Sequence, residues 1–151
     1  MSTPTVHATA VSIGGRGVLI RGPSGSGKSR LAFELISAGY SAPALVCRLV
    51  ADDRVLLSAE RDRLVAQPAP NLQGLIEIHG LGIRRCGFEP QVTVALVVDL
   101  AATDAARMPE ETSLKTVVEG ITLPRIPVAA GFSGLPLVLA ALTTDPLASR
   151  P

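Results

Sequence analysis

Aromatic residues are scarce in this chain of 151 residues, which has no tryptophan and only 3% Phe and Tyr. Hydrophobic residues nonetheless make up 47% of the sequence, so we expect a core of Ala, Val, Leu and Ile. Such a composition is typical of a sheet flanked by helices. A chain of this length can bury a full core without disulfides or metals, and we expect residues 1–151 to form a single α/β domain.

The chain also lacks an excess of charge and any long apolar run. Fourteen Lys and Arg residues against thirteen Asp and Glu residues leave a net charge of +1. No global field attracts nucleic acid or membranes, so a bound anion must be held by a local site. No segment reaches the roughly 18 consecutive apolar residues of a membrane helix, and the first ten residues do not resemble a signal peptide. We expect a cytoplasmic protein that binds neither nucleic acid nor membranes.

Cysteine is equally rare, with only Cys47 and Cys86. There is no C-x-x-C pair, and no histidine lies at the spacing of a zinc site. We therefore expect two buried free thiols, as suits the reducing cytosol.

The sequence does contain a complete phosphate-binding motif. The pattern G-x-x-x-x-G-K-[ST] is matched by Gly22, Pro23, Ser24, Gly25, Ser26, Gly27, Lys28 and Ser29. The motif follows a predicted strand and begins a predicted helix, which is the context it requires. Its glycines let backbone N–H groups surround an anion, Lys28 reaches the β- and γ-phosphates, and the Ser29 hydroxyl binds Mg²⁺. We therefore predict a site for a nucleoside triphosphate.

This motif alone does not name a reaction, because kinases, GTPases and motor ATPases share it. The guanine-reading pattern N-K-x-D is absent, which argues against a GTPase, and the chain is too short for a large motor. A protein kinase, a small-metabolite kinase and a module that senses ATP without turnover remain. A metabolite kinase normally has an arginine-rich lid, for which Arg84 and Arg85 alone are too few.

Hydrophobic periodicity and turn residues indicate the other elements. Strands are expected at residues 6–13, 17–21, 45–51, 55–58, 63–67, 75–78, 92–100 and 116–123. Helices are expected at residues 28–39 and 137–142. The run at 92–100 is expected to be a central strand buried on both faces. The segment 101–111 and the prolines at 124, 127 and 136 indicate loops.

Three carboxylates accompany the predicted strands. Asp52 and Asp53 end an apolar run, and adjacent strand residues point to opposite faces, so the two should have different roles. One of them could face the phosphate site and accept the proton of an attacking hydroxyl; a solvated turn pair is the alternative. Glu77 could bind Mg²⁺ beside Ser29, or could be an exposed strand charge.

Four motifs in this order resemble the catalytic domain of HPr kinase/phosphorylase. They are His7, the phosphate loop, Arg-Leu-Val-Ala-Asp-Asp at residues 48–53, and Ile-Glu-Ile-His-Gly-Leu-Gly-Ile at residues 76–83. The resemblance extends over about residues 7–127. It implies a P-loop-containing α/β fold similar to phosphoenolpyruvate carboxykinase, with a mixed sheet and flanking helices. It also implies that ATP and Mg²⁺ are used.

The resemblance further implies roles for individual residues. Lys28 and Ser29 would hold the nucleotide and Mg²⁺, and Glu77 would help to bind the metal. Asp52 and Asp53 would contain the proton acceptor for phosphorylation, which would become the proton donor for dephosphorylation.

Two more residues receive roles in the same way. His7 lies 21 positions before Lys28 (28 − 7 = 21), where the family has a histidine that supports the aspartate pair. Arg107 occupies the place of a family arginine that steadies phosphate charge.

The implied substrate is a serine of the phosphocarrier protein HPr or of a nitrogen-system paralogue, and the implied assembly is a hexamer. The chain lacks the N-terminal domain of the family and is expected to be a short form. The family loop Pro-Val-x-Pro-Gly-Arg-Asn is Pro-Val-Ala-Ala-Gly-Phe-Ser here, at residues 127–133. Because that loop serves dephosphorylation, the sequence favours kinase activity over phosphorylase activity, and the second activity stays open.

Overall fold

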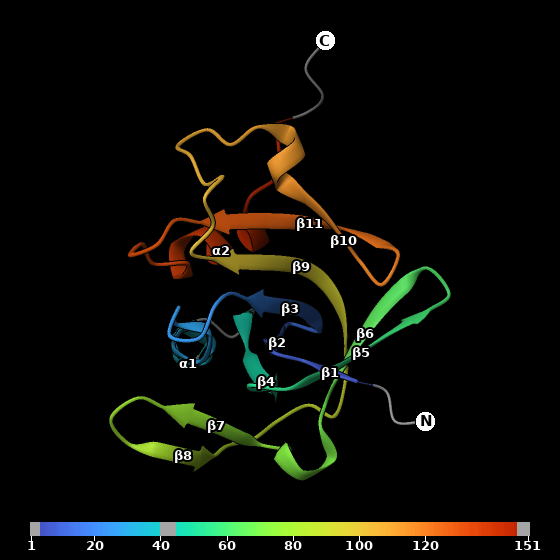
Figure 1. Ribbon diagram of the computed structural model, residues 1–151, viewed down its shortest axis with the longest axis vertical. Helices are drawn as coiled ribbons and strands as arrows, with labels where there is room; N and C mark the ends of the chain where they lie inside the picture. The colour runs from blue at the N-terminus through green and yellow to red at the C-terminus, as the bar shows by residue number, and fades with distance from the viewer. Residues whose placement is uncertain (1–3, 40–44, 148–151) are drawn as a thin grey trace.

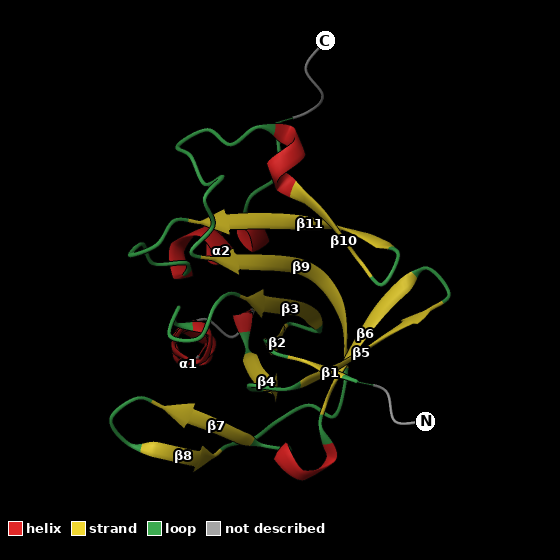
Figure 2. Cartoon of the chain, viewed as in Figure 1, coloured by secondary structure: helices red, strands yellow, loops and turns green. Residues whose placement is uncertain are grey.

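The computed structural model describes residues 4–39 and 45–147. Within these residues the chain has a mixed α/β arrangement (Figures 1 and 2). The strands are β1 (Thr5–Val6), β2 (Thr9–Ile13), β3 (Arg16–Arg21), β4 (Cys47–Ala51), β5 (Val55–Glu60), β6 (Arg63–Pro68), β7 (Leu75–Ile78), β8 (Gly82–Arg85), β9 (Val92–Leu100), β10 (Lys115–Val118) and β11 (Ile121–Val128). The helices are α1 (Lys28–Gly39) and α2 (Leu135–Thr143), with short 3₁₀ turns η2 (Pro70–Leu72) and η3 (Glu111–Leu114).

Most strands join one mixed sheet with β9 at its centre. The order is β1-β5-β6-β9-β3-β2-β4, and β11 also pairs with β9 while β10 pairs with β11. Strands β3 and β11 both run parallel to β9, whereas β6 is antiparallel to it. The carboxyl ends of β3, β9 and β11 therefore lie at the same edge of the sheet (Figure 1).

Strand β9 is central, as expected, but it is buried on both faces only in its second half. Leu96, Val97 and Val98 are buried, whereas Thr93 and Ala95 are exposed. The register with β3 shifts at this point. Leu96 is the first residue of β9 that belongs to the core shared with both helices. The first half of β9 therefore has one face that the helices do not cover.

Both helices pack on the same face of the sheet. Leu31 of α1 and Val138 of α2 share one core with Val98. The other face is covered by the curled sheet itself, where Leu64 of β6 and Leu123 of β11 pack in a second core. The flanking helices expected from the sequence are therefore present on one side only.

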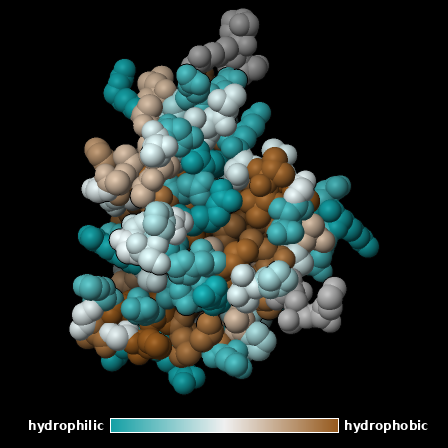
Figure 3. All heavy atoms as spheres, in the orientation of Figure 1, coloured by the Kyte–Doolittle hydropathy of each residue, from teal (hydrophilic) through white to brown (hydrophobic). Residues whose placement is uncertain are grey.

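Strands β7 and β8 form a separate two-stranded sheet below the main one in Figure 1. Ile76 of β7 is buried in the core that contains α1. Every residue of β8 is exposed. A strand without a buried face needs no alternation of apolar and polar residues, and the sequence pattern therefore predicts no strand here. Leu81 and Ile83 of this hairpin are exposed. Figure 3 shows apolar surface near its lower edge, where Figure 1 has the hairpin.

The expected strand at 116–123 and the loop expected after it are both wrong. The segment forms two antiparallel strands, β10 and β11, joined by Glu119 and Gly120. Both joining residues have positive φ, 50° and 78°, as in the tight turns that suit hairpins. Pro124 and Pro127 lie within β11; proline is compatible with a strand wherever its missing N–H is not needed for pairing.

Most of the remaining elements agree with expectation, but the strand expected at residues 6–13 is divided into β1 and β2, and Pro136 lies within α2 and not in a loop. The hairpins β2–β3 and β5–β6 form, and α2 begins with a proline in its first turn, where the missing N–H has no cost. Both cysteines are free, but Cys86 is only half-buried while Cys47 is buried. No helix among the described residues is long and apolar enough to cross a membrane.

Candidate active site

The phosphate-loop motif connects β3 to α1 as predicted. A Cβ atom at Gly22 would lie 2.6 Å from Ser26 Oγ, so only glycine allows the loop to close on itself there. Gly27 has a φ of 98° and open space around its Cα. The chain therefore enters α1 through a conformation that leaves the helix N-terminus uncovered by side chains, as anion binding requires.

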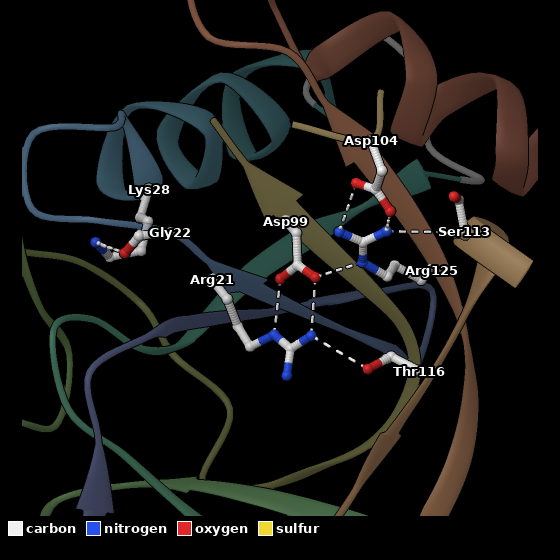
Figure 4. Close-up of polar contacts among 8 residues, drawn as sticks. All are labelled: Arg21, Gly22, Lys28, Asp99, Asp104, Ser113, Thr116 and Arg125. Carbon is white, nitrogen blue, oxygen red and sulfur yellow. Dashed lines mark hydrogen bonds and ion pairs between the residues drawn. The ribbon is translucent and has the colours of Figure 1, made fainter. Parts of the chain in front are cut away.

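Lys28 begins α1 and is only 7% exposed. Its ammonium donates a hydrogen bond to the carbonyl of Gly22 at 2.8 Å (Figure 4). It donates another to the carbonyl of Pro23 at 3.0 Å. Lys28 forms no ion pair within the part of the chain that the structure describes. A buried charge without a counter-ion is costly, and an ammonium has three N–H donors, so Lys28 is well suited to bind an anion.

Ser26 provides a second sign of a polar ligand. Its Oγ is buried and has no hydrogen-bond partner among residues 4–39 and 45–147. Buried hydroxyls are nearly always satisfied, and a phosphate oxygen held in the loop would supply the missing partner. The residues present therefore fit a nucleoside triphosphate.

Asp52 is the buried member of the acidic pair, with 4% exposure. Its Oδ1 accepts hydrogen bonds from the hydroxyls of Ser29 at 2.6 Å and Thr9 at 2.9 Å. Its Oδ2 accepts one from the backbone N–H of Glu77 at 2.9 Å. Strands β2, β4 and β7 and the start of α1 thus meet at one carboxylate. Thr9 was not among the predicted site residues, since a lone threonine in a strand has no distinguishing pattern.

Asp53 follows Asp52 directly in the chain and is exposed. The N–H of Arg54 donates to the carbonyl of Asp52 at 2.7 Å, which makes a three-residue turn with Asp53 at its middle and a φ of 68°. This left-handed conformation is strained for a side-chain-bearing residue. His7 Nε2 lies 3.0 Å from Asp53 Oδ1. His7 occupies the break between β1 and β2, where a single strand was expected.

The other two predicted residues are less constrained. Glu77 contributes its backbone to the site, and its side chain is exposed. Arg107 is exposed in the segment between β9 and η3 and makes no hydrogen bond or ion pair with any described residue. Among the described residues, no group of three or more His, Cys, Asp and Glu side chains is arranged to hold a metal ion. The Ser29 hydroxyl and the Asp52 carboxylate lie in direct contact and are the oxygen ligands that these elements bring together.

A second charged cluster, which sequence reasoning missed, lies at the ends of β3, β9 and β11. Asp99 accepts hydrogen bonds from Arg21 at 2.7 and 2.8 Å and from Arg125 at 2.5 Å (Figure 4). Arg125 also binds Asp104 and the carbonyl of Ser113. Arg125 thereby ties both ends of the loop that carries Arg107 to the sheet. The visible signal was an aspartate near the end of the most apolar strand.

The arginines dominate the electrostatics of this cluster. Burial alone would raise the pKa of Asp99, but the hydrogen bonds from Arg21 and Arg125 outweigh it and hold the pKa below its ordinary value of 3.8. The hydrogen bond from Arg125 likewise lowers the pKa of Asp104. Both carboxylates are thus ionised partners of arginine at neutral pH.

Known proteins with similar sequences and structures place this chain in a family. The sequence model of the family described as HPr Serine kinase C-terminal domain matches residues 1–144 of this chain. An HPr kinase/phosphorylase of Geobacillus thermodenitrificans is 37% identical over 85% of this chain and 44% of its own length. One of Bordetella pertussis is 37% identical over 98% of this chain and 50% of its own length. The chain thus spans about half the length of these curated relatives.

A solved structure agrees with the sequence relatives. The Hpr(Ser) kinase/phosphatase from Coxiella burnetii superposes with a TM-score of 0.71 and 30% identity, covering 91% of this chain and 92% of the other. Its likeness confirms the expected fold class, a P-loop-containing α/β fold with a mixed sheet, similar to phosphoenolpyruvate carboxykinase. The chain belongs to the family of HPr serine kinase C-terminal domains.

Proposed function

We propose that this domain transfers the γ-phosphoryl group of ATP to a serine hydroxyl of HPr or of a nitrogen-system paralogue. The observation that carries the proposal is the buried Lys28, without a counter-ion among the described residues, in a complete phosphate loop whose Ser29 touches Asp52. An anion site next to a carboxylate is what phosphoryl transfer to a hydroxyl needs. The names of the relatives support this reaction.

The phosphate loop has a clear role in this reaction. Its backbone N–H groups and the α1 N-terminus hold the phosphates, and Lys28 neutralises charge that develops on the transferred group. Ser29 and Asp52 are oxygen donors of the kind that Mg²⁺ prefers, with Glu77 as a further candidate. Bound Mg²⁺ would supply charge neutralisation on the phosphates.

Asp52 is our candidate for the proton acceptor, because it is the member of the pair held against Ser29. The serine oxygen forms a bond to the γ-phosphorus while the bond from phosphorus to the bridging oxygen of ADP breaks. The serine proton passes to the carboxylate, and the products are phosphoserine and ADP. His7 and Asp53 lie beside this centre and would help to orient it, and Arg107 would steady the charge of the phosphates.

The rest of the family assignment is also proposed for this chain. A cytoplasmic enzyme of the phosphotransferase system, assembled as a hexamer, would agree with the resemblance. The reverse reaction is not proposed, because Ala130 and Phe132 stand where the family loop has proline and arginine.

The test is transfer of label from [γ-³²P]ATP to purified HPr and to its paralogue. Lys28→Ala should abolish transfer to the acceptor while leaving the fold intact. The matched control is Lys115→Ala, which removes the other lysine of the chain from an exposed position in β10 and should leave transfer unchanged.

Three results would contradict the proposal. Undiminished transfer by Lys28→Ala would refute the role of the phosphate loop. Label on a small metabolite and none on a phosphocarrier would identify a metabolite kinase. Binding of ATP without any transfer would identify a sensing module.

A further inference from the structure

The phosphate loop borders a hollow on the side away from the acidic residues. The hollow has a volume of about 280 Å³. It is lined by residues 23–26 of the phosphate loop, by Leu100 and Ala101 at the end of β9, and by residues 129–132 after β11. The volume is near the lower end of the range typical of small-ligand sites, about 300–1,000 Å³.

The sheet order gives the site two sides. Strand β3, which leads into the phosphate loop, has β2 and β4 on one side and β9 on the other, with β11 beyond. Asp52 follows β4 and its partner Thr9 belongs to β2, so the carboxylate lies on the first side. The hollow lies on the β9 and β11 side. A triphosphate whose γ-phosphate faces Asp52 would extend its other end into the hollow.

Phe132 is the aromatic residue in the lining of the hollow. Its side chain is 75% exposed although it lines the hollow, and the chain has only three Phe residues and one Tyr. The N–H of Phe132 donates to the carbonyl of Ala129 at 3.1 Å, and Gly131 has a φ of 83°. This is the geometry of a type II turn, so the ring is presented by a defined turn beside the phosphate loop.

We propose that Phe132 stacks on the base of the bound nucleotide and that this hollow is the nucleoside subsite. An exposed aromatic ring provides a flat apolar face, and every base has a π-face that stacks on such a ring. The inference rests on the proposed function, because it takes the phosphate loop to hold a nucleotide.

The lining also predicts low selectivity for the base. Its side chains are aliphatic or aromatic apart from the hydroxyls of Ser24 and Ser26, which belong to the phosphate loop. A site that rejects the wrong base strongly needs polar groups that the wrong base leaves unpaired. We therefore expect ATP and GTP to bind within about tenfold of each other, since stacking is tolerant of base identity.

The experiment compares the binding of Mg-ATP with that of Mg-tripolyphosphate, which has the phosphates but no base. Phe132→Ala should weaken ATP binding roughly 5- to 30-fold, in the range for loss of base stacking, and leave tripolyphosphate binding unchanged. Phe132→Tyr should retain ATP affinity. The control Phe33→Ala removes another partly exposed ring, 47% exposed on α1 and outside the hollow, and should change neither affinity.

The outcomes separate this inference from the proposed function. If the unmodified protein binds both ligands and Phe132→Ala leaves ATP affinity unchanged, or weakens both ligands equally, the nucleoside subsite is refuted and the phosphate site stands. An affinity for ATP more than about 100-fold above that for GTP would refute the proposed tolerance of base identity. If neither ligand binds the unmodified protein, the proposed function fails as well.

Discussion

Two carboxylates at the ends of strands, the buried Asp52 and the half-buried Asp99, have opposite surroundings. Asp99 lies between two arginines, and its charge is fully balanced inside the protein. Asp52 receives two hydroxyls and one backbone N–H, with no cationic partner among the described residues. A balanced carboxylate holds the fold together, whereas a carboxylate that is hydrogen-bonded but not neutralised can still attract a proton or a cation. This difference supports our proposal that Asp52 takes part in the reaction, and we infer that Asp99 serves the fold.

The largest expected effect is on the transfer rate when the charge of Asp52 or of Asp99 is removed. Asp52→Asn should lower the rate of phosphoryl transfer by about 10²–10⁴-fold, the usual contribution of a general base. Asp99→Asn should keep most of the transfer rate per folded molecule. Transfer assays on both variants, with circular dichroism to count folded protein, measure the effect. Equal losses of rate in the two variants would contradict the assigned roles.

The free energy of unfolding should fall more in Asp99→Asn than in Asp52→Asn, and the loss in Asp99→Asn should depend on pH. Asp99→Asn weakens hydrogen bonds between charged groups and should lower the free energy of unfolding by about 1.5–3 kcal/mol at pH 7. Because the pKa of Asp99 is lower in the folded protein than its ordinary 3.8, the unfolded chain binds the proton more readily. The stabilisation is therefore complete well above pH 4 and is lost as the pH falls below 3.8 towards the lower folded pKa.

Denaturant unfolding at pH 7 and at a series of lower pH values checks this expectation. The stability difference between the unmodified protein and Asp99→Asn should shrink as the pH falls through this range. A difference that stays constant down to pH 3 would show that Asp99 does not act through its charge.

The smallest expected effects come from two threonines, Thr9, which binds Asp52, and Thr116, which binds the Arg21 partner of Asp99. Thr9→Val removes a hydroxyl that binds Asp52 and is fully buried, and we expect a fall of about tenfold in transfer rate, equivalent to one net hydrogen bond. Thr116→Val removes a longer contact, 3.3 Å from Arg21, while Arg21 keeps both bonds to Asp99. This variant should change neither rate nor stability by more than about 0.5 kcal/mol. A larger rate loss in Thr116→Val than in Thr9→Val would reverse the comparison.

Local sequence was sufficient for the phosphate loop and for the elements beside it. Residues 22–29 form a contiguous motif, and the strand, loop and helix follow each other directly in the chain. Hairpins β2–β3 and β5–β6 were predictable for the same reason, because adjacent strands and turn residues specify them. Strand β8 was not, since its residues are exposed and have no apolar alternation.

The candidate site was predictable only in part. Strand alternation predicted different surroundings for Asp52 and Asp53, and their surroundings do differ, but both residues follow the end of β4 and the turn at Asp53 separates them. The sequence did not indicate which of the two is buried. The partners of Asp52 lie 23 to 43 positions away in the chain, and those of Asp99 lie as far as 78 positions away. No local pattern encodes pairs at such separations.

The sequence by itself thus determined that a triphosphate loop opens a helix, because glycine, lysine and serine at consecutive positions suffice for that geometry. Only the tertiary structure decided which carboxylate lies against Ser29, which one is neutralised by arginines, and which turn presents Phe132 beside the loop. These choices depend on how the sheet brings distant strands together, and burial of the two cores sets that arrangement.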